Sequence, residues 1–184
     1  MPKKLLLILA SIFLIWQSYR LLVNIQLLQL DAWIVVLINA FLINLYITGI
    51  FAFAGFALPT QKLMPKAYYN IKNPSQLKWI YKSFNVDAFR KFLLATFWKD
   101  KQQRKKYFNG RADGIKNLEL QSMKSEFGHL IPFVIILVIG IYLIILGLVE
   151  LGFLTLVINW IGNWYPVILQ RHHRMRISRL LKYQ

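Results

Sequence analysis

Two short stretches of the chain hold residues that could carry out chemistry, and the first is SEFGHL at positions 125–130. Glu126 and His129 lie three positions apart, so a helix would place both side chains on one face. A carboxylate next to an imidazole can orient the ring and raise its basicity, which suits a general base acting on a hydroxyl group. Because Glu-x-x-His also occurs by chance in many interfacial helices, the pair alone defines only a candidate catalytic site.

The second stretch begins at Asn163 and reads NWYPVILQRHHRMR. On a helix, Asn163, Gln170 and Arg174 would fall within a stripe about 40° wide. Pro166 lies inside this stretch and could kink the helix. Such a stripe suits a polar substrate that enters between membrane helices. In the alternative interpretation, Asn163 makes an interhelical hydrogen bond and the arginines anchor the helix end to anionic lipid. For the two amides and Arg171, both interpretations stay open.

Neither stretch predicts a metal site or a resident cofactor. The chain contains three histidines and no cysteine, and a single Glu-x-x-His falls short of a metal ligand set. The lack of cysteine also excludes thiol nucleophiles and disulfides. We therefore expect no metal and no cofactor.

The composition places these stretches in a membrane protein. Of the 184 residues, 57% are hydrophobic and 16% are charged, which is more apolar than a soluble domain of this length. The 23 basic and 7 acidic residues give a net charge of +16. In a soluble protein this charge would suggest nucleic acid, but the long apolar runs favour an anionic membrane face or a phosphorylated substrate. We expect membrane lipids, and no nucleic acid, as partners.

The expected fold is all-α, a single integral membrane domain over residues 1–184 with four transmembrane helices. A spanning helix needs about 20 apolar residues. The sequence offers four such segments, at about 5–28, 33–58, 130–149 and 151–170. Four spans leave little room to enclose a bulky substrate, so a homodimer is plausible.

The distribution of charge predicts how the chain is oriented in the cell membrane. The segment between the second and third spans, 59–129, is strongly basic, and so is the tail at 171–184. The two short turns on the other side carry only Asp31 and Glu150. The positive-inside rule therefore places this central segment, the tail and both termini in the cytoplasm.

The central segment is expected to contain helices of its own. Asn73, Pro74 and Ser75 read as a helix start. The stretch 84–108 is aromatic and basic, typical of an amphipathic helix in the headgroup plane, although an ordinary helix packed on the spans fits equally well. Asn-Gly at 109–110 and Asp-Gly at 113–114 then indicate a loop.

These stretches, together with KSFN at 82–85, resemble the glycosyl-4,4'-diaponeurosporenoate acyltransferase family, small integral membrane enzymes of carotenoid biosynthesis. The resemblance extends over positions 80 to 180 and depends on an ordered set of motifs rather than on any one of them. The matching positions are Lys82 to Asn85, Trp98, Lys99, Asp100, Asp113, Gly114, Glu126, His129, Asn163, Gln170, Arg171, Arg174 and Arg176.

The resemblance implies an enzyme that moves a fatty acyl group from acyl-CoA, as co-substrate, to a sugar hydroxyl of a lipid-soluble glycoside. His129 would then be the general base, oriented by Glu126. Phosphates of acyl-CoA would be held by arginine forks, with one lysine beside them. The amides would bind the sugar or donate to the developing oxyanion. Substrate-binding residues on this interpretation are Lys99, Asp113, Asn163, Gln170, Arg171 and Arg174.

A second hypothesis comes from a different functional class. The chain could be a non-catalytic membrane scaffold or an anionic-lipid-binding protein that acts through its basic loop and tail. Such a protein would tolerate alanine at Glu126, His129 and Asn163, which only the enzyme needs. It would lose function when the lysine and arginine clusters were neutralised.

Overall fold

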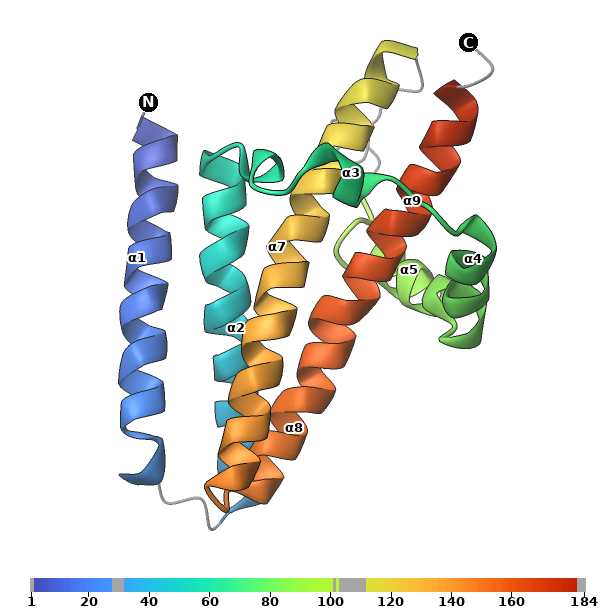
Figure 1. Ribbon diagram of the computed structural model, residues 1–184. Coiled ribbons are helices and arrows are strands. Elements are labelled where there is room, and N and C mark those ends of the chain that lie inside the picture. The colour runs from blue at the N-terminus through green and yellow to red at the C-terminus, as the bar shows by residue number, and fades with distance from the viewer. Residues whose placement is uncertain (1, 28–31, 101, 103–111, 182–184) are drawn as a thin grey trace. The chain divides into compact units, whose positions relative to one another are not determined.

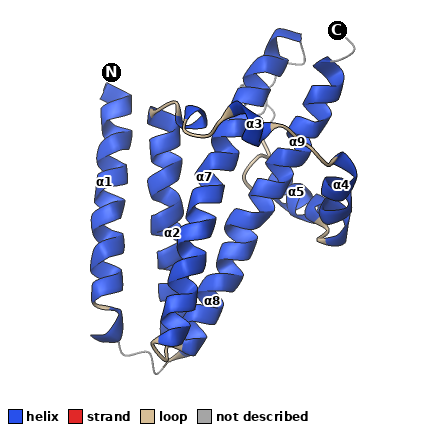
Figure 2. Ribbon diagram, viewed as in Figure 1, coloured by secondary structure: helices blue, strands red, loops and turns tan. Residues whose placement is uncertain are grey.

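A computed structural model of the protein describes residues 2–27, 32–100, 102 and 112–181 (Figure 1). Of the described residues, 87% are helical, and no strand occurs within these ranges (Figure 2). The all-α prediction is therefore confirmed.

Four helices of the described chain are long and apolar enough to cross a membrane: Pro2–Val23, Trp33–Ala57, Gly114–Ile145 and Val149–Arg179. Many of their apolar side chains point outward, as Leu6 does with 67% of its surface exposed. Such a surface would be unstable in water, but it is what a helix facing lipid presents. The protein is therefore a multi-pass membrane protein. The third and fourth of these helices extend well beyond the segments at 130–149 and 151–170 expected from the sequence.

Contacts divide the chain into two units, Met1–Thr60 with Gly128–Trp164, and Gln61–Phe127 with Tyr165–Gln184. The first unit contains α1 (Pro2–Val23), the short η1 (Ile25–Leu27), α2 (Trp33–Ala57), the later part of α7 (Ala112–Ile145), α8 (Val149–Asn159) and the π-helical turn η3 (Trp160–Trp164). α1 packs along α2, and α2 packs against α8. The buried core of this unit is aliphatic and comprises Ile25, Val36, Ala40, Ile43, Ile47, Ile136, Leu143 and Leu151.

Small residues let α7 and α8 approach each other closely in this unit. A Cβ added at Gly152 would lie 2.7 Å from the carbonyl oxygen of Gly140 and 3.0 Å from the backbone nitrogen of Ile144. Lipid tails are as apolar as the helix surfaces, so close van der Waals packing of this kind is a main source of helix association in a membrane.

The second unit contains α3 (Lys66–Tyr69), α4 (Pro74–Ser83), α5 (Val86–Ala95), the first part of α7 and α9 (Tyr165–Leu181). The 3-10 turn η2 (Thr60–Lys62) leads into it from the first unit. α4 and α5 both pack against α9. The ring of Tyr81 on α4 stacks on His172 of α9 with centroids 3.9 Å apart, and Phe89 on α5 meets Tyr165 at 5.3 Å.

Two expectations for the central segment need correction. In place of a helix over 84–108, α5 ends at Ala95, and just beyond it the Trp98 amide donates to the Leu93 carbonyl instead of continuing the α-helical pattern. Residues 101 and 103–108 of the expected helix lie outside the described residues. The Asp-Gly pair at 113–114, expected in a loop, lies in the first turn of α7, where an acidic residue favours a helix start. The expected helix start at Pro74 is confirmed. The Asn-Gly pair at 109–110 lies outside the described residues.

Candidate active site

His129, the expected base, is half-buried and belongs to a polar network in the first unit. Its Nδ1 lies 3.1 Å from the Oδ1 of Asn163, and Asn163 is 1% exposed. Asn163 lies in η3, and His129 lies on α7, so two elements far apart in the sequence supply the pair. A ring held in this way keeps one orientation, which is what a general base requires.

The amide of Asn163 is held by two further side chains. Its Nδ2 donates to the Oδ1 of Asn159 at 2.9 Å and to the Oγ1 of Thr48 at 3.0 Å. The Nδ2 of Asn159 donates in turn to the backbone carbonyl of Phe133, also at 2.9 Å. We call these five residues, including His129, the histidine network. Both N–H groups of Asn163 are engaged within it, so neither is left to donate to a substrate.

Local backbone geometry explains why the two asparagines meet. Asn159 and Asn163 are four positions apart, the spacing that brings helical side chains together. Asn163 lies within the π-helical turn Trp160–Trp164 that follows Asn159, and Pro166 comes two positions after this turn. Proline has no backbone N–H to donate into the preceding turn, which favours a local departure from the regular α-helical pattern.

A second polar group, in the other unit, surrounds Glu126. The hydroxyl of Tyr68 donates to Oε1 of Glu126 at 2.8 Å, and a guanidinium nitrogen of Arg171 lies 3.0 Å from the same oxygen. Arg174 forms an ion pair with Oε2. Glu126 is 0% exposed, so its charge is compensated entirely within the protein. We call Glu126, Tyr68, Arg171, Arg174 and Ser122 the glutamate cluster.

Arg174 directs its remaining nitrogens to other protein groups. Its Nε lies 3.4 Å from the Tyr69 carbonyl, and a terminal nitrogen donates to the Ser122 hydroxyl at 3.3 Å. Its guanidinium also lies 5.2 Å from the centroid of the Tyr69 ring. Arg171 differs, because 26% of its side chain remains exposed. One carboxylate cannot neutralise two guanidinium groups, so the cluster keeps a positive charge that Arg171 presents at the surface.

The environment of Tyr68 shows how strongly the cluster favours the neutral phenol. Burial, reinforced by the neighbouring Glu126 carboxylate, raises the pKa of Tyr68 from 10.0 to about 12. A phenolate beside that carboxylate would repel it, and the nearby Arg171 offsets this repulsion only in part. Tyr68 therefore acts as a hydrogen-bond donor to Glu126 at neutral pH.

The structure corrects the expected partnership of Glu126 and His129. The imidazole interacts with the Asn163 side chain and with the backbone of Gly162, whereas both carboxylate oxygens of Glu126 are engaged by Tyr68 and the two arginines. Charge-assisted pairs with guanidinium groups are stronger than a bond to a neutral ring, so the carboxylate is drawn to the arginines. The side chain that orients His129 is an amide.

The other predicted site residues lie in different surroundings. Gln170 accepts the Ser122 hydroxyl through its backbone carbonyl at 3.0 Å, which ties it to the glutamate cluster by its main chain. Lys99 is exposed beyond the end of α5. Asp113 lies in the first turn of α7, and its side chain falls outside what the structure describes. Their predicted roles in substrate binding stay predictions.

Four contributors were missed from the sequence. Asn159 could have been predicted from the sequence, because a second amide one turn before Asn163 is unusual in an apolar span. Thr48 could not have been predicted in this way, since threonine is common in membrane helices. Tyr68 and Ser122 could not have been predicted either, because no sequence pattern connects Tyr68 with Glu126, which lies 58 positions away.

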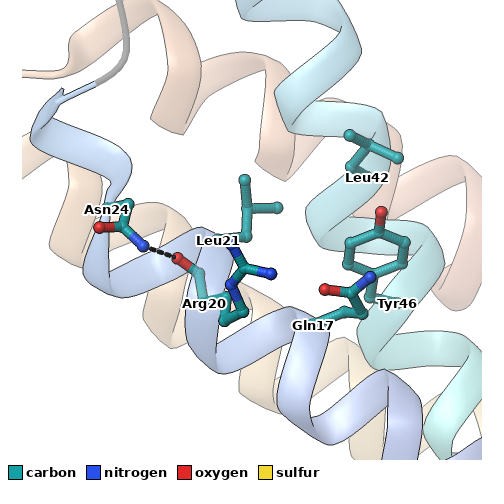
Figure 3. Close-up of a pocket in the computed structure, with 6 residues that line it drawn as sticks. All are labelled: Gln17, Arg20, Leu21, Asn24, Leu42 and Tyr46. Atoms are coloured by element: carbon teal, nitrogen blue, oxygen red, sulfur yellow. Dashed lines mark hydrogen bonds between the residues drawn. The ribbon is translucent and has the colours of Figure 1, made fainter.

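A separate polar pocket lies between α1 and α2 of the first unit, with a volume of about 280 Å³ (Figure 3). None of the predicted site residues lines it. Its walls are formed by Gln17, Arg20, Leu21, Asn24, Leu42 and Tyr46. In Figure 3 the amide of Asn24 is joined by a hydrogen bond to the backbone carbonyl of Arg20, at 2.8 Å. Within the described part of the chain, no three histidine, aspartate or glutamate side chains gather as a metal ligand set.

Comparison with known protein families found one match. The family model described as glycosyl-4,4'-diaponeurosporenoate acyltransferase (CrtO) matches residues 65–183, more than half of the chain. The matched range includes every predicted site residue and also Tyr68, Ser122 and Asn159. No curated protein and no solved structure matches the chain.

Proposed function

Since the chain belongs to the glycosyl-4,4'-diaponeurosporenoate acyltransferase family, a family of carotenoid-biosynthesis acyltransferases, we propose that it moves a fatty acyl group from acyl-CoA to a hydroxyl of a lipid-soluble glycoside. The observation that carries this proposal is the hydrogen bond between His129 and Asn163, which gives a potential base a fixed orientation inside a membrane helix. A scaffold or lipid anchor would have no use for a half-buried, oriented imidazole.

In the proposed reaction, His129 acts as general base on the acceptor. The imidazole takes the proton of the sugar hydroxyl while the hydroxyl oxygen attacks the thioester carbon of acyl-CoA. A new C–O ester bond forms, the C–S bond breaks, and the thiolate of coenzyme A leaves. The proton then passes from the imidazolium to the thiolate, which restores the base. Because the chain has no cysteine, direct transfer within a ternary complex is favoured over a thiol-linked acyl-enzyme.

We assign recognition of the donor phosphates to Arg171. Its partial exposure and the excess positive charge of the glutamate cluster support this role. Arg174 is 3% exposed and engaged by Glu126, Ser122 and Tyr69, so we assign it a structural role that keeps Glu126 in place. Arginine suits the donor because its planar fork matches phosphate oxygens. Lys99, which is exposed, would add a second cation to the donor site.

The proposal is tested with the purified full-length protein in nanodiscs. Radiolabelled long-chain acyl-CoA is supplied with extracted glycolipids, and the label that enters the lipid fraction is measured. Wild-type protein should transfer the label, and His129→Ala should lose most of the rate, because general base catalysis contributes about 10²–10⁴-fold. His172→Phe is the matched control, since it also removes an imidazole yet keeps a ring to stack on Tyr81. Equal transfer by wild type and His129→Ala would remove His129 from the mechanism.

We also propose that the enzyme resides in the cell membrane with both termini in the cytoplasm. The strongly basic central segment and tail support this orientation through the positive-inside rule. The chain contains no cysteine, so single cysteines report cleanly on sidedness. In intact cells, a membrane-impermeant maleimide should label Glu150→Cys and leave Ser75→Cys unlabelled. The reverse pattern would invert the topology.

A further inference from the structure

The orientation of each amide in the histidine network is fixed by a single group that can only accept a hydrogen bond. The backbone carbonyl of Phe133 has no hydrogen to donate, so the side-chain atom of Asn159 that lies 2.9 Å from it must be the NH₂ group. The Oδ1 of Asn159 consequently points the other way. The assignment of oxygen and nitrogen in Asn159 therefore follows from the network itself.

The same reasoning carries to the next residue. The Oδ1 of Asn159 can only accept, so the atom of Asn163 that faces it at 2.9 Å must be the NH₂ group. The second hydrogen of this NH₂ group is taken by Thr48. The Oδ1 of Asn163 is left facing His129, and the hydroxyl of Thr48 can also donate to it, at 3.2 Å. Rotating the Asn163 amide by half a turn would place its oxygen against the Oδ1 of Asn159, and the two acceptors would repel each other.

The final step reaches the imidazole. The Oδ1 of Asn163 lies 3.1 Å from Nδ1 of His129, and two acceptor lone pairs at that distance would repel each other. Nδ1 must therefore carry a hydrogen, and a neutral imidazole has only one. We propose that Asn159 and Asn163 form a relay that sets the tautomer of His129, with the proton on Nδ1 and the lone pair on Nε2. Asn159 is thus a positioning residue that acts on His129 through Asn163.

This inference rests on the proposed function for its catalytic meaning. With the proton held on Nδ1, Nε2 is the atom that removes the proton of the acceptor hydroxyl. An unconstrained histidine side chain in water favours the opposite tautomer, so the relay would select the form that this chemistry requires. The relay uses an amide where many hydrolases use a carboxylate, and it adds no charge to a helix inside the membrane.

The test measures the tautomer directly and needs no turnover. Full-length protein with ¹⁵N-labelled histidine rings is placed in nanodiscs at a pH where the imidazole is neutral. The His129 signals are those missing from His129→Gln. In wild type, Nδ1 should show the shift of a protonated ring nitrogen and Nε2 that of an unprotonated one. A proton on Nε2 in the neutral wild-type ring would by itself overturn the proposal, before any Asn159 variant is measured.

Variants of the relay then test its direction. Asn159→Leu removes the groups that fix Asn163, so part of the His129 population should move its proton to Nε2. In the transfer assay kcat should fall, by no more than the about 10²–10⁴-fold of general base catalysis, while KM for acyl-CoA stays unchanged. Asn39→Leu is the matched control, since Asn39 is a buried asparagine whose amide donates to the Val35 carbonyl of its own helix. It should leave the tautomer as in wild type.

A double variant separates positioning from a merely structural role. A carboxylate at position 163 accepts from Nδ1 whatever its neighbour does, so Asn159→Leu with Asn163→Asp should restore the proton to Nδ1. Failure of this rescue, or a wild-type tautomer in Asn159→Leu, would refute the relay. If the tautomer responds as expected and no acyl transfer is found, the relay stands and the proposed function fails. If acyl transfer is found and the tautomer ignores Asn159, the proposed function stands and the relay fails.

Discussion

Glu126 and Arg174 form an ion pair that is closed to solvent, with the carboxylate 0% and the guanidinium 3% exposed. Such a pair contributes little more to the free energy of unfolding than a well-packed apolar pair would, because both ions lose their hydration on folding. Its loss is costly for a different reason, since removing one partner leaves the other charge buried without compensation. The pair therefore holds α7 and α9 of the second unit in one arrangement.

Glu126→Gln should destabilise the protein strongly. The glutamine is nearly the same size but leaves the buried Arg174 unpaired, which costs about 3–5 kcal/mol. Chemical denaturation in a fixed detergent, followed by circular dichroism, measures the change. Glu119→Gln is the matched control, because Glu119 lies seven positions earlier on α7 and no ion pair is found for it among the described residues. Equal stability of the two variants would contradict a structural role for the pair.

Arg171→Ala should weaken donor binding more than folding. Arg171 is partly exposed, and in our proposal it contacts the phosphates of acyl-CoA. A hydrogen bond to a charged group contributes about 1.5–3 kcal/mol, so KM for acyl-CoA should rise about tenfold or more. Steady-state transfer at varied acyl-CoA measures this effect. Arg176→Ala, which removes an exposed arginine of the same helix, should leave KM unchanged. If both variants raised KM equally, the effect would come from the loss of any positive charge and not from a specific contact of Arg171 with the donor.

The stability contributed by Tyr68 should depend on alkaline pH. Burial and the Glu126 carboxylate raise the pKa of Tyr68 to about 12 in the folded protein, against 10.0 for an ordinary tyrosine. A raised folded pKa means that the contribution is complete below pH 10 and is lost as the pH rises through 12. Tyr68→Phe should therefore be less stable at neutral pH and lose less stability between pH 10 and pH 12.

Unfolding curves at a series of pH values, compared with wild type, measure this difference. Tyr19→Phe serves as the control, because Tyr19 is 65% exposed and its loss should leave the pH dependence unchanged. An identical alkaline loss in Tyr68→Phe and wild type would show that the phenol of Tyr68 is not responsible.

The sequence predicted that four spanning helices exist, because long apolar runs favour them, but it did not predict how far the third and fourth extend into polar sequence. The uncharged run that begins at Trp33 forms α2, and that helix ends one residue before the expected Leu58. Boundaries set by single hydrogen bonds were wrong. At the end of α5 the Trp98 amide bonds to the Leu93 carbonyl, five positions back, and no periodicity in the sequence reveals that bond.

Sequence spacing predicted that Glu126 pairs with His129, whereas the structure gives each of them other partners. Glu126 and His129 do share a helix, yet a short offset around the helix axis suffices to give two side chains different neighbours. Their partners come from elsewhere, with Tyr68 lying 58 positions from Glu126 and Asn163 lying 34 positions from His129. Which partner each residue meets is decided by tertiary packing, and one sequence does not encode that in any local pattern.

Gly152→Ala should destabilise the first unit, because the added methyl group meets backbone atoms of α7 as well as the Ile144 side chain. The Cβ would lie 2.6 Å from Cγ1 of Ile144 and 2.7 Å from the backbone carbonyl oxygen of Gly140, so the backbone as well as a side chain must shift. Overpacking of this kind costs about 1–3 kcal/mol. Thermal unfolding in detergent should show the loss. Gly162→Ala is the matched control, since no described neighbour lies within 4 Å of its Cβ position and alanine favours helix over glycine. If Gly152→Ala were as stable as Gly162→Ala, close contact between α7 and α8 would not be what holds these helices together.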